Sequence, residues 1–394
     1  MRYQSYLNTA KKIIESFAGT EPLSAYLKKF FAAEKKYGSR DRKQIAALCY
    51  DFYRLGKALH DTPVEERILL ATFLCENEPN EFLQFHKPEW NEKISSPLTR
   101  KLLIIDHSLL PADLFPYHDQ LTEGADAEHF TRSFLQQPDL FLRIRPGKKD
   151  IVLKKLEQAS FNYKLIGENC VALTNSTKLD ALVRLDKEAV IQDLNSQKVL
   201  DYLKNEMNNG QLAIGNDVSV WDCCAASGGK SILAYDILQG ELTLTVSDIR
   251  EGILTNLKKR FSEAGITGYA SFITDLSIAD SRLPAPDYKL IICDAPCTGS
   301  GTWSRTPEQL YYFDIKQINT FALLQRKIVS NVTGHLQKDG LFIYITCSVF
   351  KKENEEIVNF LKEKFHLQLL QMEFLKGYDK RADSMFAAVF RKTI

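Results

Sequence analysis

The sequence has little that would place the protein in a membrane. No apolar run approaches the roughly 18 residues needed to span a bilayer, and the N-terminus lacks a basic segment followed by an apolar core. We therefore expect a cytoplasmic protein with no membrane partner. Neither sign of charge dominates, because 51 Lys and Arg residues stand against 50 Asp and Glu residues. Any nucleic-acid surface must then be local.

Zinc-type cysteine spacing is also absent. The chain has eight cysteines, but none forms the C-x-x-C pairs typical of tetrahedral zinc sites. We expect no metal ion, and free thiols suit a reducing compartment. A buried free cysteine usually fills core, so each one is taken as core filler unless its position indicates chemistry.

Three compositions follow one another along the chain. Residues 1–135 carry helical periodicity broken by Gly and Pro, which predicts an all-helical domain. Residues 136–195 read strand, helix, strand, strand, which predicts a small α/β linker module. Residues 196–394 repeat strand then helix, with strands that are apolar throughout, including a helix over 251–264 and another from Glu308. This alternation predicts a doubly wound α/β domain with helices on both faces of a parallel sheet.

The stretch "DCCAASGGKS", residues 222–231, follows the first strand of that domain and has three possible functions. A phosphate-binding P-loop needs glycine where the chain has Cys224. A redox pair is disfavoured, because Cys223 and Cys224 at the end of a strand should point to opposite faces, one of them into the core. The remaining possibility is a turn of small residues against which an uncharged cofactor lies.

Acidic residues recur at the ends of successive predicted strands. Asp248 ends the second strand, where an acid takes the ribose hydroxyls of a nucleotide-like cofactor. Asp275 closes the third strand, where it would meet an adenine edge, and Asp294 closes the fourth. Each alone would be an ordinary loop or cap residue. Three acidic residues at strand ends, together with the lack of a phosphate-binding loop, favour S-adenosylmethionine over NAD as the cofactor.

Two cysteines follow the fourth and fifth strands, in "CDAPCTGSG" and "YITCSVF". Cys297 and Cys347 should therefore emerge beside the cofactor, which is a poor place for core filler. Amino-group methyltransferases have an aromatic residue where this chain has Cys297, so we expect thiol chemistry. A thiolate that adds to a pyrimidine ring activates the neighbouring carbon toward a sulfonium methyl, and Asp294 is placed to protonate the opposite ring edge.

Four motifs resemble one known family. "DCCAASGGK", "SDIREGILTNLKKR", "DAPCTGSGTWSR" and "YITCSVFKKENEEIV" look like the signatures of the Sun/Fmu (RsmB-type) family of S-adenosylmethionine-dependent RNA cytosine-5 methyltransferases. "LFLRIRP", "VIQDLNSQKV" and "SMFAAVFRK" extend the similarity over residues 138–394. The resemblance implies a Rossmann-like methyltransferase domain with a mostly parallel seven-stranded sheet.

The resemblance also implies roles for individual residues. Cys347 would be the nucleophile on carbon 6 of cytosine, and Cys297 would help to release the product. Asp294 would face the base, with Lys230 nearby. The positions that would line the cofactor pocket are Cys224, Ala225, Ala226, Ser227, Gly228, Gly229, Lys230, Asp248, Asp275 and Asp294.

Two positions depart from the family pattern. Proline is usual where this chain has Ser227, and the change is expected to loosen the cofactor turn. Asparagine is usual where the chain has Arg145, which lies outside the catalytic set.

The helical region around "GSRDRKQIAALCYDFYRLGKAL" is more loosely similar to a NusB-like RNA-binding domain. Residues 1–60 hold twelve Lys or Arg residues against five acids, which suits either a solvated helix face or an RNA surface. The leading prediction is a monomeric enzyme that methylates small-subunit (16S) ribosomal RNA. Transfer RNA is an alternative substrate, and an inactive RNA-binding assembly factor is an alternative function.

Overall fold

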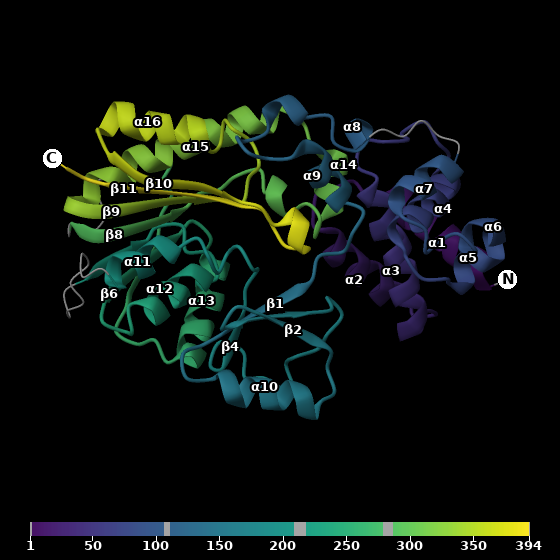
Figure 1. Cartoon of the computed structure of the whole chain (residues 1–394), viewed down its shortest axis with the longest axis horizontal. Coiled ribbons are helices and arrows are strands. Elements are labelled where there is room, and N and C mark those ends of the chain that lie inside the picture. Colours follow the sequence, from purple (N-terminus) through teal and green to yellow (C-terminus); the bar gives the residue numbers. More distant parts are fainter. Residues whose placement is uncertain (1, 106–110, 209–217, 279–286, 394) are drawn as a thin grey trace. The chain divides into compact units, whose positions relative to one another are not determined.

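The computed structural model describes residues 2–105, 111–208, 218–278 and 287–393, which form two compact units (Figure 1). Unit 1 comprises Met1–Asp119, Asp126–Gln137 and Thr302–Ile315. Unit 2 comprises Gln120–Ala125, Pro138–Gly301 and Lys316–Ile394. Each unit therefore contains at least one segment that is remote in sequence from the rest of it.

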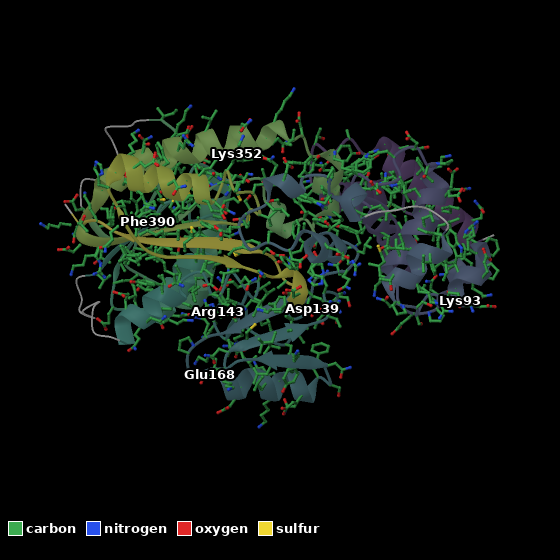
Figure 2. All side chains as sticks on the ribbon, turned by 45° about the horizontal axis from the view of Figure 1, so that its top comes forward. Lys93, Asp139, Arg143, Glu168, Lys352 and Phe390 are labelled. Carbon is green, nitrogen blue, oxygen red and sulfur yellow. The ribbon has the colours of Figure 1, made fainter. Side chains whose placement is uncertain are left out.

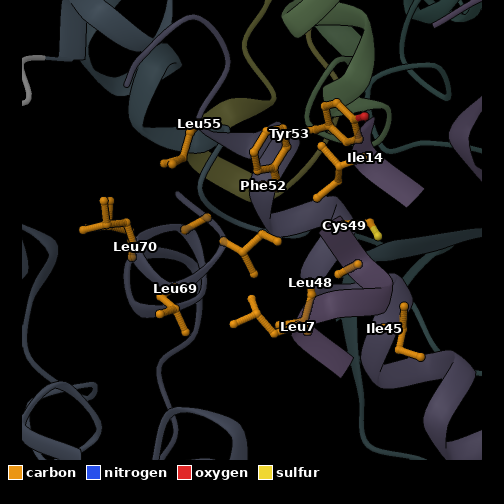
Figure 3. Close-up of a cluster of buried hydrophobic side chains, with 14 of the residues drawn as sticks. Leu7, Ile14, Ile45, Leu48, Cys49, Phe52, Tyr53, Leu55, Leu69 and Leu70 are labelled. Atoms are coloured by element: carbon orange, nitrogen blue, oxygen red, sulfur yellow. The ribbon is translucent and has the colours of Figure 1, made fainter. Parts of the chain in front are cut away.

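Unit 1 is helical in its described part, as predicted. Its helices are α1 (Arg2–Ser16), α2 (Leu23–Ala33), α3 (Ser39–Arg54), α4 (Val64–Cys75), α5 (Glu81–His86), α6 (Pro88–Asn91), α7 (Leu98–Ile104), α8 (Pro111–Leu114), α9 (Ala127–Ser133) and α14 (Pro307–Tyr312). Prolines precede α2, α4 and α7 directly, where the missing N–H costs no helical hydrogen bond. Figure 3 shows the core, in which Leu7 of α1, Leu48 of α3 and Leu69 of α4 converge.

Helix α14 belongs to unit 1, although in sequence it follows the fourth strand of the predicted doubly wound domain. Lys57 Nζ donates to the carbonyls of Tyr311 at 2.7 Å and Phe313 at 3.0 Å. The expected single helix from Glu308 is therefore wrong. Two helices, α14 and α15 (Lys316–Val332), replace it. Phe313 has an extended backbone conformation, and its carbonyl accepts a hydrogen bond from Lys57 instead of from a helical N–H.

The small module is a four-stranded antiparallel sheet in unit 2. It contains β1 (Leu140–Ile144), α10 (Lys149–Gln158), β2 (Tyr163–Ile166), β3 (Cys170–Leu173) and β4 (Ala189–Ile191), in the order β2-β3-β1-β4. The predicted strand, helix, strand, strand order is confirmed, and β4 is an addition to it. In Figure 2, Arg143 marks β1 and Glu168 marks the turn between β2 and β3.

The principal sheet has seven strands in the order β10-β11-β9-β8-β5-β6-β7. They are β5 (Ser219–Asp222), β6 (Thr243–Asp248), β7 (Ala270–Ile273), β8 (Tyr288–Asp294), β9 (Leu336–Thr346), β10 (Gln368–Leu375) and β11 (Met385–Arg391). Strands β5 to β9 pair in parallel, whereas β11 pairs antiparallel with both β9 and β10. The predicted mostly parallel, seven-stranded fold is confirmed.

Helices cover both faces of this sheet (Figure 1). Helices α11 (Asp201–Asn208), α12 (Gly229–Ile237) and α13 (Glu251–Ala264) pack on one face through Leu203, Ile232 and Leu257. Helices α15 and α16 (Glu355–Phe365) pack on the other through Val329 and Val358. Strand order reverses between β5 and β8, which is where doubly wound sheets open a crevice for ligands.

None of the helices in the described ranges is both long enough and apolar enough to cross a membrane.

Candidate active site

A cavity of about 500 Å³ opens at the carboxyl ends of the central strands in unit 2. Its lining comes from the turns after β5, β6, β7, β8 and β9, together with Leu324 and Ile328 of α15. Seven of the predicted site residues line it: Cys224, Ala226, Asp248, Asp275, Asp294, Cys297 and Cys347. The cavity thus gathers residues separated by more than a hundred positions in the chain.

The turn after β5 is built for close backbone approach. Ala226 has φ +45° and Gly228 has φ +83°, both in the left-handed region. A Cβ added at Gly228 would stand 2.7 Å from Cε1 of Phe261, so only glycine fits against α13. Four predicted turn residues, Ala225, Ser227, Gly228 and Gly229, form this support without lining the cavity.

Asp248 is held at the cavity wall by hydrogen bonds. Its Oδ2 accepts from the Ala226 amide at 3.0 Å, and its Oδ1 accepts from the amide and Nε of Arg250, both at 2.9 Å. Burial acts to raise the pKa of Asp248, but the Arg250 and Ala226 hydrogen bonds prevail and lower it below its ordinary value. The carboxylate is therefore charged and available as an acceptor at neutral pH.

Asp294 is paired with Lys230, which lies behind the cavity on α12. Lys230 Nζ donates to Asp294 Oδ2 at 2.5 Å. Burial acts to lower the pKa of Lys230, but the charge and hydrogen bond of Asp294 prevail and raise it. The pair thus keeps a protonated amine next to the acid that faces the cavity.

The two predicted active cysteines are brought together. Cys297 Sγ and Cys347 Sγ lie 3.4 Å apart, although fifty residues separate them in sequence. Both are half-buried on the cavity wall. The neighbouring Cys347 sulfur and burial raise the pKa of the Cys297 thiol, which therefore retains its proton at neutral pH.

The prediction for the vicinal cysteines is wrong in geometry. Instead of opposite faces, the sulfurs of Cys223, Cys224 and Cys293 lie within 4.8 Å of one another. The reason is that β5 ends at Asp222, so strand alternation no longer governs the two cysteines that follow. Cys223 is fully buried, as expected for one of the pair.

Ser227, the first departure from the family pattern, is tied down by hydrogen bonds. Nη1 of Arg260 on α13 donates to both the carbonyl and the hydroxyl of Ser227 at 2.9 Å. Arg260 also forms an ion pair with Asp186, Nη2 to Oδ1 at 2.7 Å. The guanidinium thus links the Ser227 turn to the α13 helix, a contact that opposes the expected loosening of the turn.

Arg145, the second departure, is a structural residue. Its Nη2 lies 2.6 Å from Asp236 Oδ1, and its Nη1 donates to the carbonyls of Asp186 and Ala264. Arg143 reaches the other oxygen of Asp236 at 2.5 Å. Two guanidinium groups of the small sheet thus share one buried carboxylate on α12.

Sequence reasoning missed several contributors. Arg250 contacts Asp248, and Leu276, Leu324 and Ile328 supply an apolar part of the lining. Glu353 lies behind both cysteine loops. Only Arg250 carried a signal in the sequence, because it stands two residues after the strand-end acid.

The basic excess near the N-terminus is partly neutralised. Six of its twelve members form ion pairs: Arg2, Lys11, Lys12, Lys29, Lys36 and Arg40. Arg54 and Lys57 instead donate to backbone carbonyls within unit 1. These residues therefore do not form a uniformly basic helix face.

Comparison with known proteins agrees with this arrangement. Residues 210–389 match the family of 16S rRNA methyltransferases RsmB/F. The predicted family resemblance is thereby confirmed. Ribosomal RNA small subunit methyltransferase B of Enterobacter sp. (strain 638) is 28% identical over 238 residues, which are 58% of this chain and 52% of that protein. Ribosomal RNA small subunit methyltransferase F of Psychromonas ingrahamii is 28% identical over 158 residues, 40% of this chain and 33% of that protein.

The matched curated relatives extend beyond the aligned region, so the chain spans about half of their length or less. Two solved structures have a fold similar to that of this chain. The crystal structure of PH0851 covers 98% of this chain and 98% of its own, at TM-score 0.71 and 16% identity. NSun6 from Pyrococcus horikoshii with SFG covers 72% of this chain and 97% of its own, at TM-score 0.59 and 14% identity.

Proposed function

We propose that the protein transfers a methyl group from S-adenosylmethionine to carbon 5 of a cytosine in RNA, with small-subunit ribosomal RNA as the substrate. The observation that carries the proposal is the pair of cysteine sulfurs 3.4 Å apart on a cavity that Asp294 also lines. The RsmB/F match and the names of the curated relatives support the reaction and the ribosomal substrate. This substrate is consistent with the predicted cytoplasmic location.

The cavity fits the proposed cofactor. Small residues in the turn leave the backbone open, Asp248 offers carboxylate oxygens for ribose hydroxyls, and Leu276 and Ile328 offer an apolar wall for a purine. SFG, bound to the structural neighbour NSun6, is an analogue of S-adenosylmethionine. When bound, the cofactor supplies an electrophilic methyl group on a sulfonium centre.

The first step uses Cys347 as a thiolate. Its sulfur forms a bond to carbon 6 of cytosine, and the electrons of the 5,6 double bond move toward the ring nitrogen. The Lys230 ammonium passes a proton to Asp294, with which it is hydrogen-bonded, and Asp294 delivers that proton to the ring nitrogen. Carbon 5 then has the electron density to take the methyl group.

The second step uses Cys297. After methylation, carbon 5 carries both the methyl group and its original hydrogen. A base removes that proton, the 5,6 double bond re-forms, and the Cys347 sulfur leaves carbon 6 as a thiolate. The ring nitrogen returns its proton through Asp294 to Lys230. Cys297, whose sulfur is in contact with that of Cys347, assists this elimination.

A duplex would hide one edge of the target ring, so the cytosine must be unpaired or flipped. Unit 1 would bind structured RNA, as its loose similarity to NusB-like domains implies. Transfer RNA remains the alternative substrate. An inactive assembly factor is the alternative function, and the complete set of Cys297, Cys347, Asp294 and Lys230 around one cavity weighs against it.

Incubation with methyl-labelled S-adenosylmethionine and unmodified small-subunit rRNA tests the proposal. Nucleosides from the digested RNA are then identified by mass spectrometry. Label in 5-methylcytidine is the expected result. Label only when tRNA is supplied would change the substrate, and cofactor binding without label on either RNA or on ribosomal particles would favour the assembly factor.

A further inference from the structure

The loops that carry Cys297 and Cys347 meet at a third side chain. Thr298 directly follows Cys297, and Ser348 directly follows Cys347. Glu353, which does not line the cavity, accepts hydrogen bonds from both of these residues. We propose that Glu353 is a positioning residue that fixes the separation of the two cysteine sulfurs and thereby the order of attack and release. This inference rests on the proposed function.

Both carboxylate oxygens of Glu353 take part. Oε1 accepts from the Thr298 amide at 2.8 Å. Oε2 accepts from the Thr298 hydroxyl at 2.6 Å and from the Ser348 hydroxyl. A single rigid group therefore holds the residue after each cysteine, and a movement of either loop breaks a charge-assisted hydrogen bond.

Glu353 is itself immobilised. Its side chain is fully buried, and Gln325 Nε2 on α15 donates to Oε1 at 3.3 Å and to the Pro296 carbonyl at 2.9 Å. The Tyr344 hydroxyl on β9 donates to the Glu353 carbonyl at 2.7 Å. Helix α15 thus anchors the carboxylate of Glu353, and strand β9 anchors its backbone carbonyl.

Burial of a carboxylate is costly unless donors compensate for the lost water. Burial raises the pKa of Glu353, and the hydrogen bonds from Ser348, Thr298 and Gln325 oppose this rise. A hydrophobic residue of similar size would avoid that cost if the site needed only to be filled. The four converging donors indicate that the loops, not the core volume, require an acceptor here.

Other hydrogen bonds also connect the two cysteine loops, and the contribution of Glu353 must be distinguished from theirs. The Gly301 amide donates to the Cys347 carbonyl at 2.8 Å, and the Val349 amide donates to the Ser300 hydroxyl at 2.9 Å. The first contact holds the backbone of Cys347 itself, and the second lies two residues beyond it. The Thr298 and Ser348 hydroxyls also lie 3.4 Å apart, and Glu353 is the acceptor that both of them share. Glu353 accepts hydrogen bonds from the residue that follows each cysteine, Thr298 and Ser348. Loss of its carboxylate should therefore increase the distance between the two sulfurs without unfolding the loops.

The test measures the distance between the thiols directly. Dibromobimane becomes fluorescent when it bridges two thiols, and peptide mass spectrometry locates the bridge between Cys297 and Cys347. The variants are Glu353→Ala, which removes the acceptor, and Glu353→Gln, which keeps one oxygen while the Thr298 and Ser348 hydroxyls can turn to accept from the amide. The control is Glu188→Gln, which alters a buried carboxylate of the small module that Lys155 contacts.

We expect Glu353→Ala to lose most of the bridged product and to lower kcat about 100-fold, the scale of a misplacement near 1 Å. The KM for S-adenosylmethionine should not change. Glu353→Gln should recover bridging and most turnover, and Glu188→Gln should behave as wild type in both. Wild-type bridging in Glu353→Ala, or failure of Glu353→Gln to recover it, would overturn the proposal. Bridging needs no RNA, so a wild-type protein that bridges but does not methylate would refute the proposed function alone.

Discussion

At the scale of single residues, the proposed reaction assigns different tasks to two thiols. Cys347 directly follows β9, and Cys297 lies three residues after the end of β8. The contact with Cys347 and burial raise the pKa of Cys297. A thiol that keeps its proton is a poor nucleophile, which is consistent with the proposed role of Cys297 in release rather than in attack.

Replacement of each cysteine should separate these tasks. With Cys297→Ala, attack proceeds but release stalls, so a covalent protein–RNA adduct should accumulate on a denaturing gel in the presence of S-adenosylmethionine. With Cys347→Ala, neither adduct nor product should form. Cys75→Ala, outside the cavity, serves as the control. An adduct with Cys347→Ala instead would exchange the two roles.

Asp222 is a second residue whose environment has a measurable consequence. It is fully buried below the cofactor turn, and its Oδ2 accepts from the Ser231 hydroxyl at 2.5 Å. Burial raises its pKa from 3.8 to about 7. The folded protein therefore keeps this proton over a pH range in which the unfolded chain has released it.

This difference predicts how stability depends on pH. The Asp222 contribution is full below about pH 4 and is lost as the pH rises through about 7, by up to about 4 kcal/mol. Asp222→Asn, which stays neutral, should be more stable than wild type at pH 8 and similar to it at pH 4. Urea denaturation at the two pH values measures this. The exposed Asp201→Asn should show no such divergence, and an equal effect of Asp222→Asn at both values would contradict the argument.

At the scale of elements, helix α13 supports the cofactor turn. Phe261 excludes any side chain at position 228, and Arg260 clamps Ser227. Asp186 of the small module neutralises the same guanidinium. A proline at position 227 would restrict the turn through its own ring. In this chain, a hydrogen bond from Arg260, 33 residues later, restrains Ser227 instead.

Removal of that contact should weaken cofactor binding specifically. Arg260→Met keeps the aliphatic stem but loses the donors to Ser227, so the Kd for S-adenosylmethionine should rise about tenfold, equivalent to about 1.4 kcal/mol. Isothermal titration calorimetry measures it. Lys259→Met, one position earlier on the exposed side of α13, should leave the Kd unchanged. Unaltered binding in Arg260→Met would show that the turn is stiff without the clamp.

At the scale of the whole molecule, the chain passes between its two units more than once. The segment Thr302–Ile315 leaves unit 2 just after the Cys297 loop and packs in unit 1 before α15 begins. There the ring of Tyr53 lies 5.2 Å from that of Tyr311 and 6.1 Å from that of Tyr312. The core of the helical unit therefore contains residues of a segment that begins five positions after Cys297.

Truncation of Tyr53 should affect both stability and catalysis. Tyr53→Ala removes a fully buried ring and should lower the stability of unit 1 by about 3–5 kcal/mol. Turnover should fall as well, because the restraint on residues 302–315 weakens, while cofactor affinity stays constant. Thermal melts and methyl-transfer assays measure the two effects. Phe85→Ala, a half-exposed aromatic of the same unit, is the control. Destabilisation with full turnover would show that the loop does not depend on unit 1.

Much of the fold was predictable because it is recorded in local patterns. The helix over 251–264 has the predicted bounds, and Asp294 closes strand β8, the fourth strand of the predicted domain, as expected. Asp248, Asp294, Cys297 and Cys347 could be placed on the cavity because the ends of parallel strands share one edge. The break between helices α14 and α15 at Phe313 could not be predicted, because it depends on a contact with Lys57, more than 250 residues earlier.

The sequence by itself determined the class of fold, the strand-end positions of the acids and cysteines, and the family to which their motifs are similar. These follow from hydrophobic periodicity and from spacing along the chain, which act locally. Only the tertiary structure decided the 3.4 Å contact between the two sulfurs, the Arg260 clamp, the convergence of donors on Glu353 and the membership of α14 in unit 1. Each of these is a contact between residues remote in sequence, and its geometry arises only when the packed elements fix both partners at once.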